Sequence, residues 1–248
     1  MTRTKYHTFE DFAPAEFAQD YKGKAAAQLM FMYRKVMEKS NPVILELGTA
    51  KGTSTTVFLQ ACEEKDGRLV SVDIEDCSDI SDSSRWQFVQ ADSTDVNLIL
   101  KEAPLLKNGI DILYIDSLHT RGHVEKELTG WYPYLKEQSW IFFDDVDSNP
   151  YRKGNRKDNF KAEVAWDSIH EYVKEFYYAN EDSIQLNIFY GSTGLASMYK
   201  LSSKGTLPYK AKSIIHRDNN LLNRMRYNLL FISSAVKRRF CVKLKKES

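Results

Sequence analysis

Two short stretches of the chain carry carboxylates and a histidine directly after apolar runs, where they could bind a metal ion and move a proton. They are Tyr114-Ile-Asp116-Ser-Leu-His119 and Phe142-Phe-Asp144-Asp145-Val146. If each run is a strand and the two strands are neighbours, the three carboxylates converge, and hard cations such as Mg²⁺ prefer oxygen ligands. A histidine with a pKa near neutrality could serve beside them as a general base. We therefore expect Asp116, Asp144 and Asp145 to hold a metal ion, and His119 and Asp116 to be catalytic.

Other residues compete for these roles. His119 could instead be a hydrogen-bonded structural histidine, with His123 as the functional one. Asp145 could cap a helix or a turn, which would leave Asp147 as the alternative ligand. At this point, the residues alone leave both choices open.

A glycine turn, Glu46-Leu-Gly-Thr-Ala-Lys-Gly52, follows an earlier apolar run. Its glycines let the backbone approach a ligand, and the helix expected after it exposes amide donors at its N-terminus. The Gly-x-x-x-Gly spacing lacks the Gly-x-Gly-x-x-Gly fingerprint of dinucleotide-binding proteins. Acids close the successive apolar runs at Glu46, Asp73, Asp92, Asp116 and Asp144. Ligands of doubly wound sheets bind at the carboxyl ends of strands. This row of acids at one edge of the sheet, called the rim below, therefore predicts a nucleotide-like ligand, with Asp73 accepting hydrogen bonds from its ribose hydroxyls.

The elements that must position these residues alternate along the chain. Short apolar, β-branched runs predict strands, and longer stretches with helical spacing predict helices between them. The expected strands are 43–45, 68–73, 86–92, 110–116 and 140–144, and the expected helices are 54–64, 96–106, 122–135 and 162–178. A hairpin is expected over 184–201, around the turn Gly191-Ser-Thr-Gly194. We therefore predict an α/β fold with a doubly wound, mostly parallel sheet.

Over roughly 42–201, these motifs together resemble the class I S-adenosylmethionine (SAM) dependent methyltransferases. The resemblance implies a seven-stranded sheet whose last strand is antiparallel, with SAM as cofactor. Glu46 belongs to the first motif of that family, whose residues Gly48, Thr49, Gly52 and Ser54 would flank the methionine end. Asp73 with Ile74 would hold the ribose, and Ala91, Asp92 and Ser93 would lie at the adenine edge.

The acceptor side resembles the divalent-metal-dependent sugar O-methyltransferases of macrolide and rhamnosyl type and their cephalosporin-hydroxylase-like relatives. Those proteins carry Asp-x-x-His after the fourth strand and an acidic pair after the fifth, which matches Asp116 to His119 and Asp144-Asp145. The resemblance implies Mg²⁺-assisted methylation of a hydroxyl, with a sugar or glycosylated small molecule as acceptor. Two adjacent hydroxyls chelating the ion would be oriented and acidified for deprotonation.

Two other functions remain as alternatives. One is a catechol-like or small-molecule N-methyltransferase, which would differ in its need for Mg²⁺ and a vicinal diol. The other is a non-catalytic module of the same fold that binds nucleic acid or membrane through its basic tail. The intact acids Glu46 and Asp73 and the three carboxylates of Asp116, Asp144 and Asp145 disfavour this second alternative.

Length and composition indicate one sizeable core with additions. The 248 residues are 42% apolar, and no stretch approaches the roughly 20 apolar residues of a membrane span. We expect a helical segment over 1–40, with polar starts at Thr8 and Asp20, then a SAM-binding domain over 41–202 and an extension over 203–248. With no signal-peptide pattern and three scattered cysteines, the expected compartment is the cytosol.

Charge is distributed unevenly. From residue 203 onward there are 12 Lys and Arg against 2 Asp and Glu, whereas the preceding residues are acidic overall. Apolar residues recur there at helical spacing, which predicts an amphipathic basic helix: Leu221, Leu222, Met225, Leu229, Ile232, Val236 and Phe240. Such a helix could dock on the acidic body, on a second subunit of a homo-oligomer or on an anionic membrane, and nucleic acid is the less favoured partner.

The polar segment 147–161 is expected to be a loop over the acceptor. Its Arg152, Lys153, Arg156 and Lys157 could contact an anionic substrate, or the segment could be an ordinary solvated loop.

Overall fold

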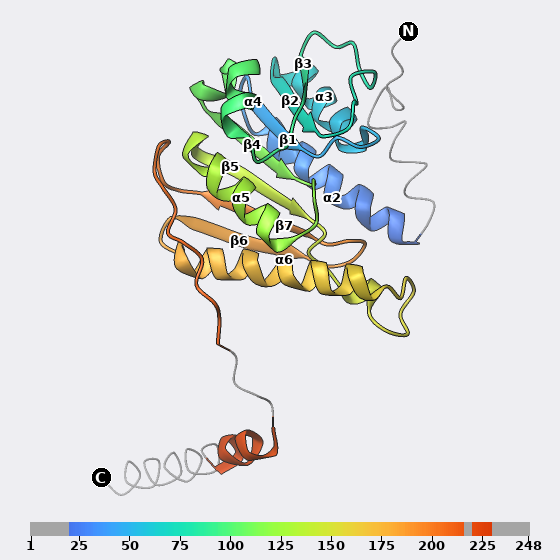
Figure 1. Cartoon of the computed structure of the whole chain (residues 1–248), viewed down its shortest axis with the longest axis vertical. Helices are drawn as coiled ribbons and strands as arrows, with labels where there is room; N and C mark the ends of the chain where they lie inside the picture. The colour runs from blue at the N-terminus through green and yellow to red at the C-terminus, as the bar shows by residue number, and fades with distance from the viewer. Residues whose placement is uncertain (1–19, 216–219, 230–248) are drawn as a thin grey trace, which may run out of the picture. The chain divides into compact units, whose positions relative to one another are not determined.

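The computed structural model describes residues 20–215 and 220–229, and the chain divides into two compact units, 1–212 and 213–248. The expected helix start at Thr8 lies outside the described residues. In the first unit a single seven-stranded sheet carries helices on both faces (Figure 1).

The sheet has the order β3-β2-β1-β4-β5-β7-β6. Its strands are β1 (Val43–Leu47), β2 (Arg68–Asp73), β3 (Trp86–Gln90), β4 (Ile110–Ile115), β5 (Leu135–Asp144), β6 (Ile184–Phe189) and β7 (Leu195–Lys200). The first five strands run parallel, while β7 is antiparallel to both β5 and β6. This confirms the predicted α/β fold, including the antiparallel last strand.

Two hydrophobic cores lie on opposite faces of the sheet. On one face, α2 (Asp20–Met37) and α3 (Thr53–Lys65) cover Ile44, Tyr114 and Phe142. On the other, α4 (Val96–Glu102), α5 (Arg121–Trp131) and α6 (Phe160–Ala179) cover their sequence neighbours Leu45 and Phe143, as Figure 1 lets the reader follow. Alternate residues of a strand point to opposite faces, so a strand buried on both faces has the continuous apolar sequence from which it was predicted.

Strand register brings the carboxyl ends of the central strands to one edge. Leu47 of β1 pairs with Val72 of β2 and with Ile115 of β4. Asp73 ends β2, Asp116 follows β4 directly and Asp144 ends β5. Three of the acids predicted at strand ends therefore share one rim, whereas Glu46 lies within β1 and is buried, because the strand extends to Leu47.

Several element boundaries differ from the expectation, most clearly around Pro133. The helix expected to reach residue 135 ends at Trp131, and a 3₁₀ turn with Pro133 follows it. The strand expected from residue 140 begins at Leu135. Proline cannot donate the backbone hydrogen bond that a continuing helix needs, so the chain leaves the helix there and joins the sheet early.

The first residues of the extension expected from residue 203 contact the rest of the first compact unit. Gly205 N donates to Pro133 O (2.8 Å), and Tyr209 exchanges two hydrogen bonds with the Asn180 side chain (2.7 and 3.0 Å). Residues 203–212 accordingly belong to the first compact unit.

In the second unit, residues 221–229 form a helix on which Leu221, Leu222, Met225 and Leu229 are exposed. The predicted continuation through Ile232, Val236 and Phe240 lies outside the described residues. Docking of this helix on the body, a second subunit or a membrane stays a prediction. Among the described helices, none combines the length and apolar character that a membrane span requires.

Candidate active site

The glycine turn after β1 is folded against Asp73. Thr49 N (2.8 Å) and Ala50 N (3.0 Å) donate to one carboxylate oxygen of Asp73, and Glu75 N donates to the other (3.0 Å). Burial acts to raise the pKa of Asp73, but these backbone amides outweigh it and hold the pKa below its usual value. The carboxylate at the end of β2 is thus ionised, and in this charge state it can accept hydrogen bonds from hydroxyl groups.

Gly48 places the turn directly against the end of β4. Its φ is 95°, and a Cβ at this position would stand 2.1 Å from the carbonyl oxygen of Asp116. Only glycine fits so close an approach in the left-handed region. The glycine turn and the Asp116 segment therefore share one end of the sheet.

Glu46 lies beneath this turn, with no exposed surface. Its carboxylate accepts hydrogen bonds from Ser54 (2.5 Å), Thr55 (2.7 Å) and Ser71 (2.5 Å). Burial nevertheless raises the pKa of Glu46 to about 7. Glu46 and Ser54 therefore join β1, α3 and β2 under the turn, and their predicted contact with a cofactor stays a prediction.

The residues expected at the adenine edge follow β2 and β3. The Ile74 side chain is 71% exposed beside Asp73 and offers an apolar surface. Asp92 accepts hydrogen bonds from the amide (2.8 Å) and hydroxyl (2.7 Å) of Thr94, whereas Ala91 and Ser93 are buried. Ser93 donates to Glu127 (2.5 Å), so its hydroxyl is already engaged.

One buried polar atom of the turn is left without a partner. Among the residues that the structure describes, Thr49 Oγ1 is buried and makes no hydrogen bond. Buried hydroxyls are normally hydrogen-bonded, so an orphaned one at a glycine turn fits a ligand that supplies the missing partner. Together with the ionised Asp73 and the exposed Ile74, it makes the residues present suitable for SAM.

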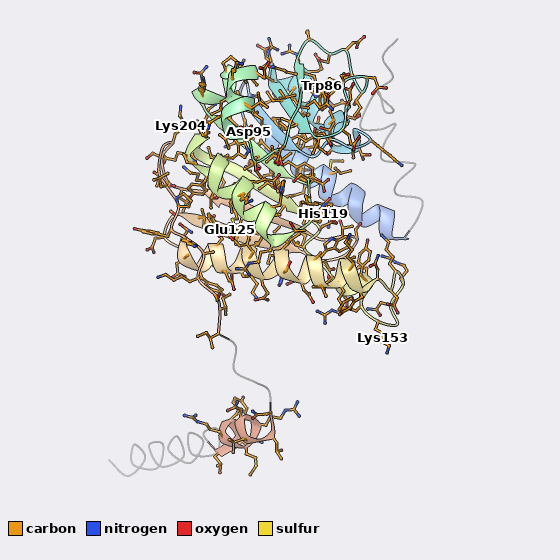
Figure 2. The ribbon with its side chains drawn as sticks, viewed as in Figure 1. Trp86, Asp95, His119, Glu125, Lys153 and Lys204 are labelled. Atoms are coloured by element: carbon orange, nitrogen blue, oxygen red, sulfur yellow. The ribbon has the colours of Figure 1, made fainter. Side chains whose placement is uncertain are left out.

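The acceptor-side residues form a compact group around His119, which Figure 2 labels. His119 Nε2 lies 3.0 Å from Asp116 Oδ1 and 3.1 Å from Asp145 Oδ2. The potential ligand atoms of Asp116, His119 and Asp145 all lie within 4.8 Å of one another. The structure thus unites three of the four residues predicted for this site.

The fourth residue, Asp144, is not part of this group but is hydrogen-bonded to residues next to it. Its Oδ1 accepts from the amide of Asp145 (2.8 Å) and the hydroxyl of Thr193 (2.9 Å). The Tyr114 hydroxyl lies between Asp144 (3.1 Å) and Asp116 (3.0 Å). Asp144 therefore supports its neighbours, and its predicted role as a direct metal ligand stays a prediction.

Negative charge is in excess around His119, because three carboxylates lie near this one histidine. Burial first, and then the neighbouring carboxylates, raise the pKa values of Asp144 and Asp145. Burial disfavours the charged form of His119, but its hydrogen bond to Asp116 and the charges of Asp145, Asp116 and Asp144 prevail and raise its pKa to about 9. This differs from the near-neutral pKa expected for a base. A bound cation would offset the carboxylate charges that contribute to all three shifts.

The two alternatives from the sequence lie elsewhere. His123 Nε2 is 3.0 Å from Ser93 Oγ and 3.4 Å from Glu127, beside the segment that follows β3. The Asp147 carboxylate accepts hydrogen bonds from Gly191 N (2.7 Å) and Asn149 N (3.0 Å). It therefore connects the turn between β6 and β7 to the segment that follows β5. Neither belongs to the group around His119.

Sequence reasoning missed two residues of the site, Tyr114 and Thr193. Tyr114 was detectable, because residues two apart on a strand point the same way and Asp116 follows two positions later. Thr193 reaches Asp144 across 49 positions, and nothing in the local sequence indicates that contact.

The segment after the acidic pair is tied down at several points. Asn149–Tyr151 form a 3₁₀ turn, Ser148 donates to Asp167 (2.5 Å), and Arg152 pairs with the same carboxylate (3.3 Å). Lys153 lies at the outer end of the segment in Figure 2. Arg152 pairs with Asp167, its side chain remains half exposed, and contact of these basic side chains with an anionic substrate stays a prediction.

A cavity of about 410 Å³ opens between this segment, α6 and the β6–β7 turn. Polar side chains and one aromatic ring line it, among them Asp147, Arg152, His170 and Tyr190. A second, more apolar cavity of about 610 Å³ lies between α2 and the end of β6, and Tyr190 borders both.

Comparison with known proteins agrees with this geometry. Residues 45–146 match the family model of a methyltransferase domain. No curated protein sequence matches the chain. A methyltransferase-domain model thus matches this part of the chain, and the sheet has the class I methyltransferase fold that the motifs predicted.

Solved structures share this fold at low sequence identity. One is the MycE methyltransferase of the mycinamycin pathway in complex with Mg and SAH, with a TM-score of 0.58, 16% identity and 83% of this chain covered. The chain spans 58% of the length of that protein. Another is the TDP-rhamnose 3′-O-methyltransferase of calicheamicin biosynthesis, with a TM-score of 0.52, 20% identity, and 74% of this chain and 81% of that chain covered.

Proposed function

We propose that this protein transfers the methyl group of SAM to a hydroxyl of a sugar or of a glycosylated small molecule, with the help of Mg²⁺. One observation carries the proposal: the glycine turn and the group around His119 meet at the end of β4, where Gly48 packs on the Asp116 backbone. A methyl donor on the turn and an acceptor hydroxyl at the carboxylates would therefore be neighbours, and positioning supplies much of the rate of such a transfer.

On the donor side, each residue would orient one part of SAM. Asp73 would accept the ribose hydroxyls and Ile74 would cover the adenine. Thr49 and the first turn of α3 would meet the methionine end, because helix N-termini offer amide donors to carboxylates. The sulfonium methyl would then face the end of β4.

On the acceptor side, the donor set fits a hard divalent cation. Asp116 and Asp145, with Asp144 behind them, would hold Mg²⁺, which when bound supplies charge that orients and acidifies a hydroxyl. Neutralising these carboxylates would lower the pKa of His119 from about 9 toward neutrality. His119 would then take the proton of the acceptor hydroxyl at Nε2.

The two cavities support an acceptor that has polar and apolar parts. The smaller cavity offers donors, acceptors and the ring of Tyr190, and this mixture suits a sugar ring. The larger one offers Met30, Phe31 and Phe189 to an apolar remainder. Mycinamycin VI and TDP-rhamnose, named for two proteins of the same fold, are the first acceptors to test.

The test is transfer of a labelled methyl group from SAM to a panel of sugars and glycosides, with Mg²⁺ or with a chelator. We expect product that depends on the metal, and a loss of about 10²-fold or more in Asp116→Asn, because that change removes a ligand and a proton-holding group together. Asp182→Asn, at an exposed position, is the matched control. Product formation that ignores the chelator would overturn the metal-assisted part of the proposal.

A further inference from the structure

The turn between β6 and β7, residues 190–194, reaches the acidic pair. Thr193 Oγ1 donates to Asp144 Oδ1 (2.9 Å), and the carbonyl of Thr193 accepts from the amide of Asp147 (2.8 Å). A segment from the far end of the domain thus touches the residues on either side of Asp145.

Three further contacts fix this turn in place. Gly191 N donates to Asp147 (2.7 Å), and Gly191 O accepts from the Gln28 side chain of α2 (3.1 Å). Gly194 has a φ of 82°, and a Cβ there would stand 2.5 Å from the amide of Asp147. The Thr193 hydroxyl is therefore held against Asp144 by the surrounding backbone.

The Asp144 carboxylate connects the Thr193 hydroxyl to the backbone of Asp145. The oxygen that receives the Thr193 hydroxyl also receives the amide of Asp145 (2.8 Å). Asp145 has a φ of 58°, a left-handed backbone conformation that is uncommon for residues other than glycine. In that conformation its carboxylate faces His119 at 3.1 Å. A continuous set of contacts therefore runs from Thr193 through Asp144 to the potential ligand Asp145.

We propose that Thr193 is a positioning residue for the metal site: its hydroxyl orients Asp144, and through the Asp145 amide it orients the Asp145 carboxylate. This inference rests on the proposed function, because it assumes that the carboxylates hold a divalent cation. Groups that orient metal ligands typically change metal affinity by about 10- to 100-fold when they are removed.

The test measures Mn²⁺ binding to the full chain by electron paramagnetic resonance, which needs no acceptor and no turnover. Mn²⁺ takes the same oxygen ligands as Mg²⁺. Thr193→Val keeps the side-chain shape and removes the hydroxyl, while Thr193→Ser keeps the hydroxyl and removes the methyl group. Thr129→Val, at an exposed threonine of α5, is the matched control.

We expect Thr193→Val to weaken Mn²⁺ binding by about 10- to 100-fold. Thr193→Ser and Thr129→Val should bind Mn²⁺ like the wild type, and all variants should bind SAM equally. Equal Mn²⁺ affinity in Thr193→Val and the wild type would overturn the inference and leave the proposed function standing. So would equal weakening in the valine and serine variants, since the serine variant keeps the hydroxyl and the effect would then not depend on it.

Two other outcomes are distinguishable. If the wild type binds no Mn²⁺, the metal part of the proposed function fails and the inference fails with it. If Thr193→Val loses SAM binding and its folded circular dichroism spectrum, Thr193→Ala is measured in its place, and wild-type Mn²⁺ affinity in that variant would overturn the inference.

Discussion

His119 is surrounded by carboxylates, and the balance of that charge decides whether its imidazole can accept a proton. At the residue scale, its contacts with Asp116 and Asp145 also separate it from His123, which faces Ser93 and Glu127. The two histidines left open by the sequence therefore have different surroundings, and a pair of matched variants can tell their roles apart.

We predict that His119→Gln lowers kcat by about 10² to 10⁴, the usual contribution of a general base, with little change in SAM affinity. His123→Gln should retain most of the activity, because its neighbours Ser93 and Glu127 lie outside the group around His119. Steady-state kinetics and SAM titration on both variants check this. A larger fall in kcat for His123→Gln would reverse the assignment.

The raised pKa of Glu46 leads us to predict that the free energy of unfolding depends on pH. Its pKa is about 7 in the folded chain against 4.5 for an ordinary glutamate, because it is buried. A raised folded pKa means that the folded state keeps a proton that the unfolded state releases, so its contribution to stability falls as pH rises from about 4.5 to about 7. Relative to Glu46→Gln, the wild type should lose on the order of 1 to 3 kcal/mol of unfolding free energy over that window.

Urea unfolding of both proteins at pH 5 and pH 8 measures this difference. Glutamine is a suitable reference, because the hydroxyls of Ser54, Thr55 and Ser71 can rotate to serve it. A difference that stays constant between the two pH values would show that Glu46 does not titrate in this window.

At the scale of elements, the close packing of the glycine turn on β4 is directly testable. We predict that Gly48→Ala weakens SAM binding by about tenfold or more and destabilises the fold by about 1 to 3 kcal/mol, because its φ is 95° and its Cβ would collide with Asp116. Gly122→Ala in α5 is the control, since its Cβ would meet nothing within 4 Å. That helical substitution should leave SAM binding unchanged and stabilise the fold by up to about 1 kcal/mol.

Calorimetric SAM titration and thermal unfolding of the two variants provide the measurement. If Gly48→Ala binds SAM as tightly as Gly122→Ala does, the turn is not the cofactor site.

The elements also show why part of the structure was predictable. Strand β4, Ile110–Ile115, is buried on both faces, so its sequence is apolar except at Asp111 and its end is marked by Asp116. The first half of β5 contains Lys136, Glu137 and Gln138, and it joins the sheet through an irregular register with β4. This half of β5 is a strand because it pairs with β4, which is distant in the sequence, and a local sequence pattern does not indicate such pairing.

The same reason explains the incomplete prediction of the site. Asp116 and His119 are three residues apart, so their contact follows from local spacing. Thr193 meets Asp144 because β7 pairs antiparallel with β5, with Leu195 opposite Asp144. Only the sheet register brings those two residues together, and it was not available from the sequence.

At the scale of the whole molecule, the boundary between the two compact units makes a prediction about truncation. A chain ending at Lys212 should keep SAM affinity, whereas one ending at Ser202 should lose stability. The shorter chain lacks the bond from Gly205 to Pro133, both bonds between Tyr209 and Asn180, and one carbonyl partner of the buried Lys200. At about 1 kcal/mol for each hydrogen bond, the loss is on the order of 3 to 4 kcal/mol.

Urea unfolding of the two truncated chains, followed by circular dichroism, checks this expectation. Equal unfolding midpoints would place the end of the methyltransferase domain near residue 202, as the sequence suggested. A lower midpoint for the shorter chain would confirm that residues 203–212 are part of the domain.

The central claim is that this chain binds SAM at the rim defined by Gly48 and Asp73, and isothermal titration calorimetry of the full chain with SAM tests it most directly. We predict binding of about one SAM per chain with or without Mg²⁺, and a large loss of affinity in Asp73→Ala, because this carboxylate both receives the ribose and holds the turn through Thr49 and Ala50. Absence of SAM binding to the wild type under both conditions would contradict the account.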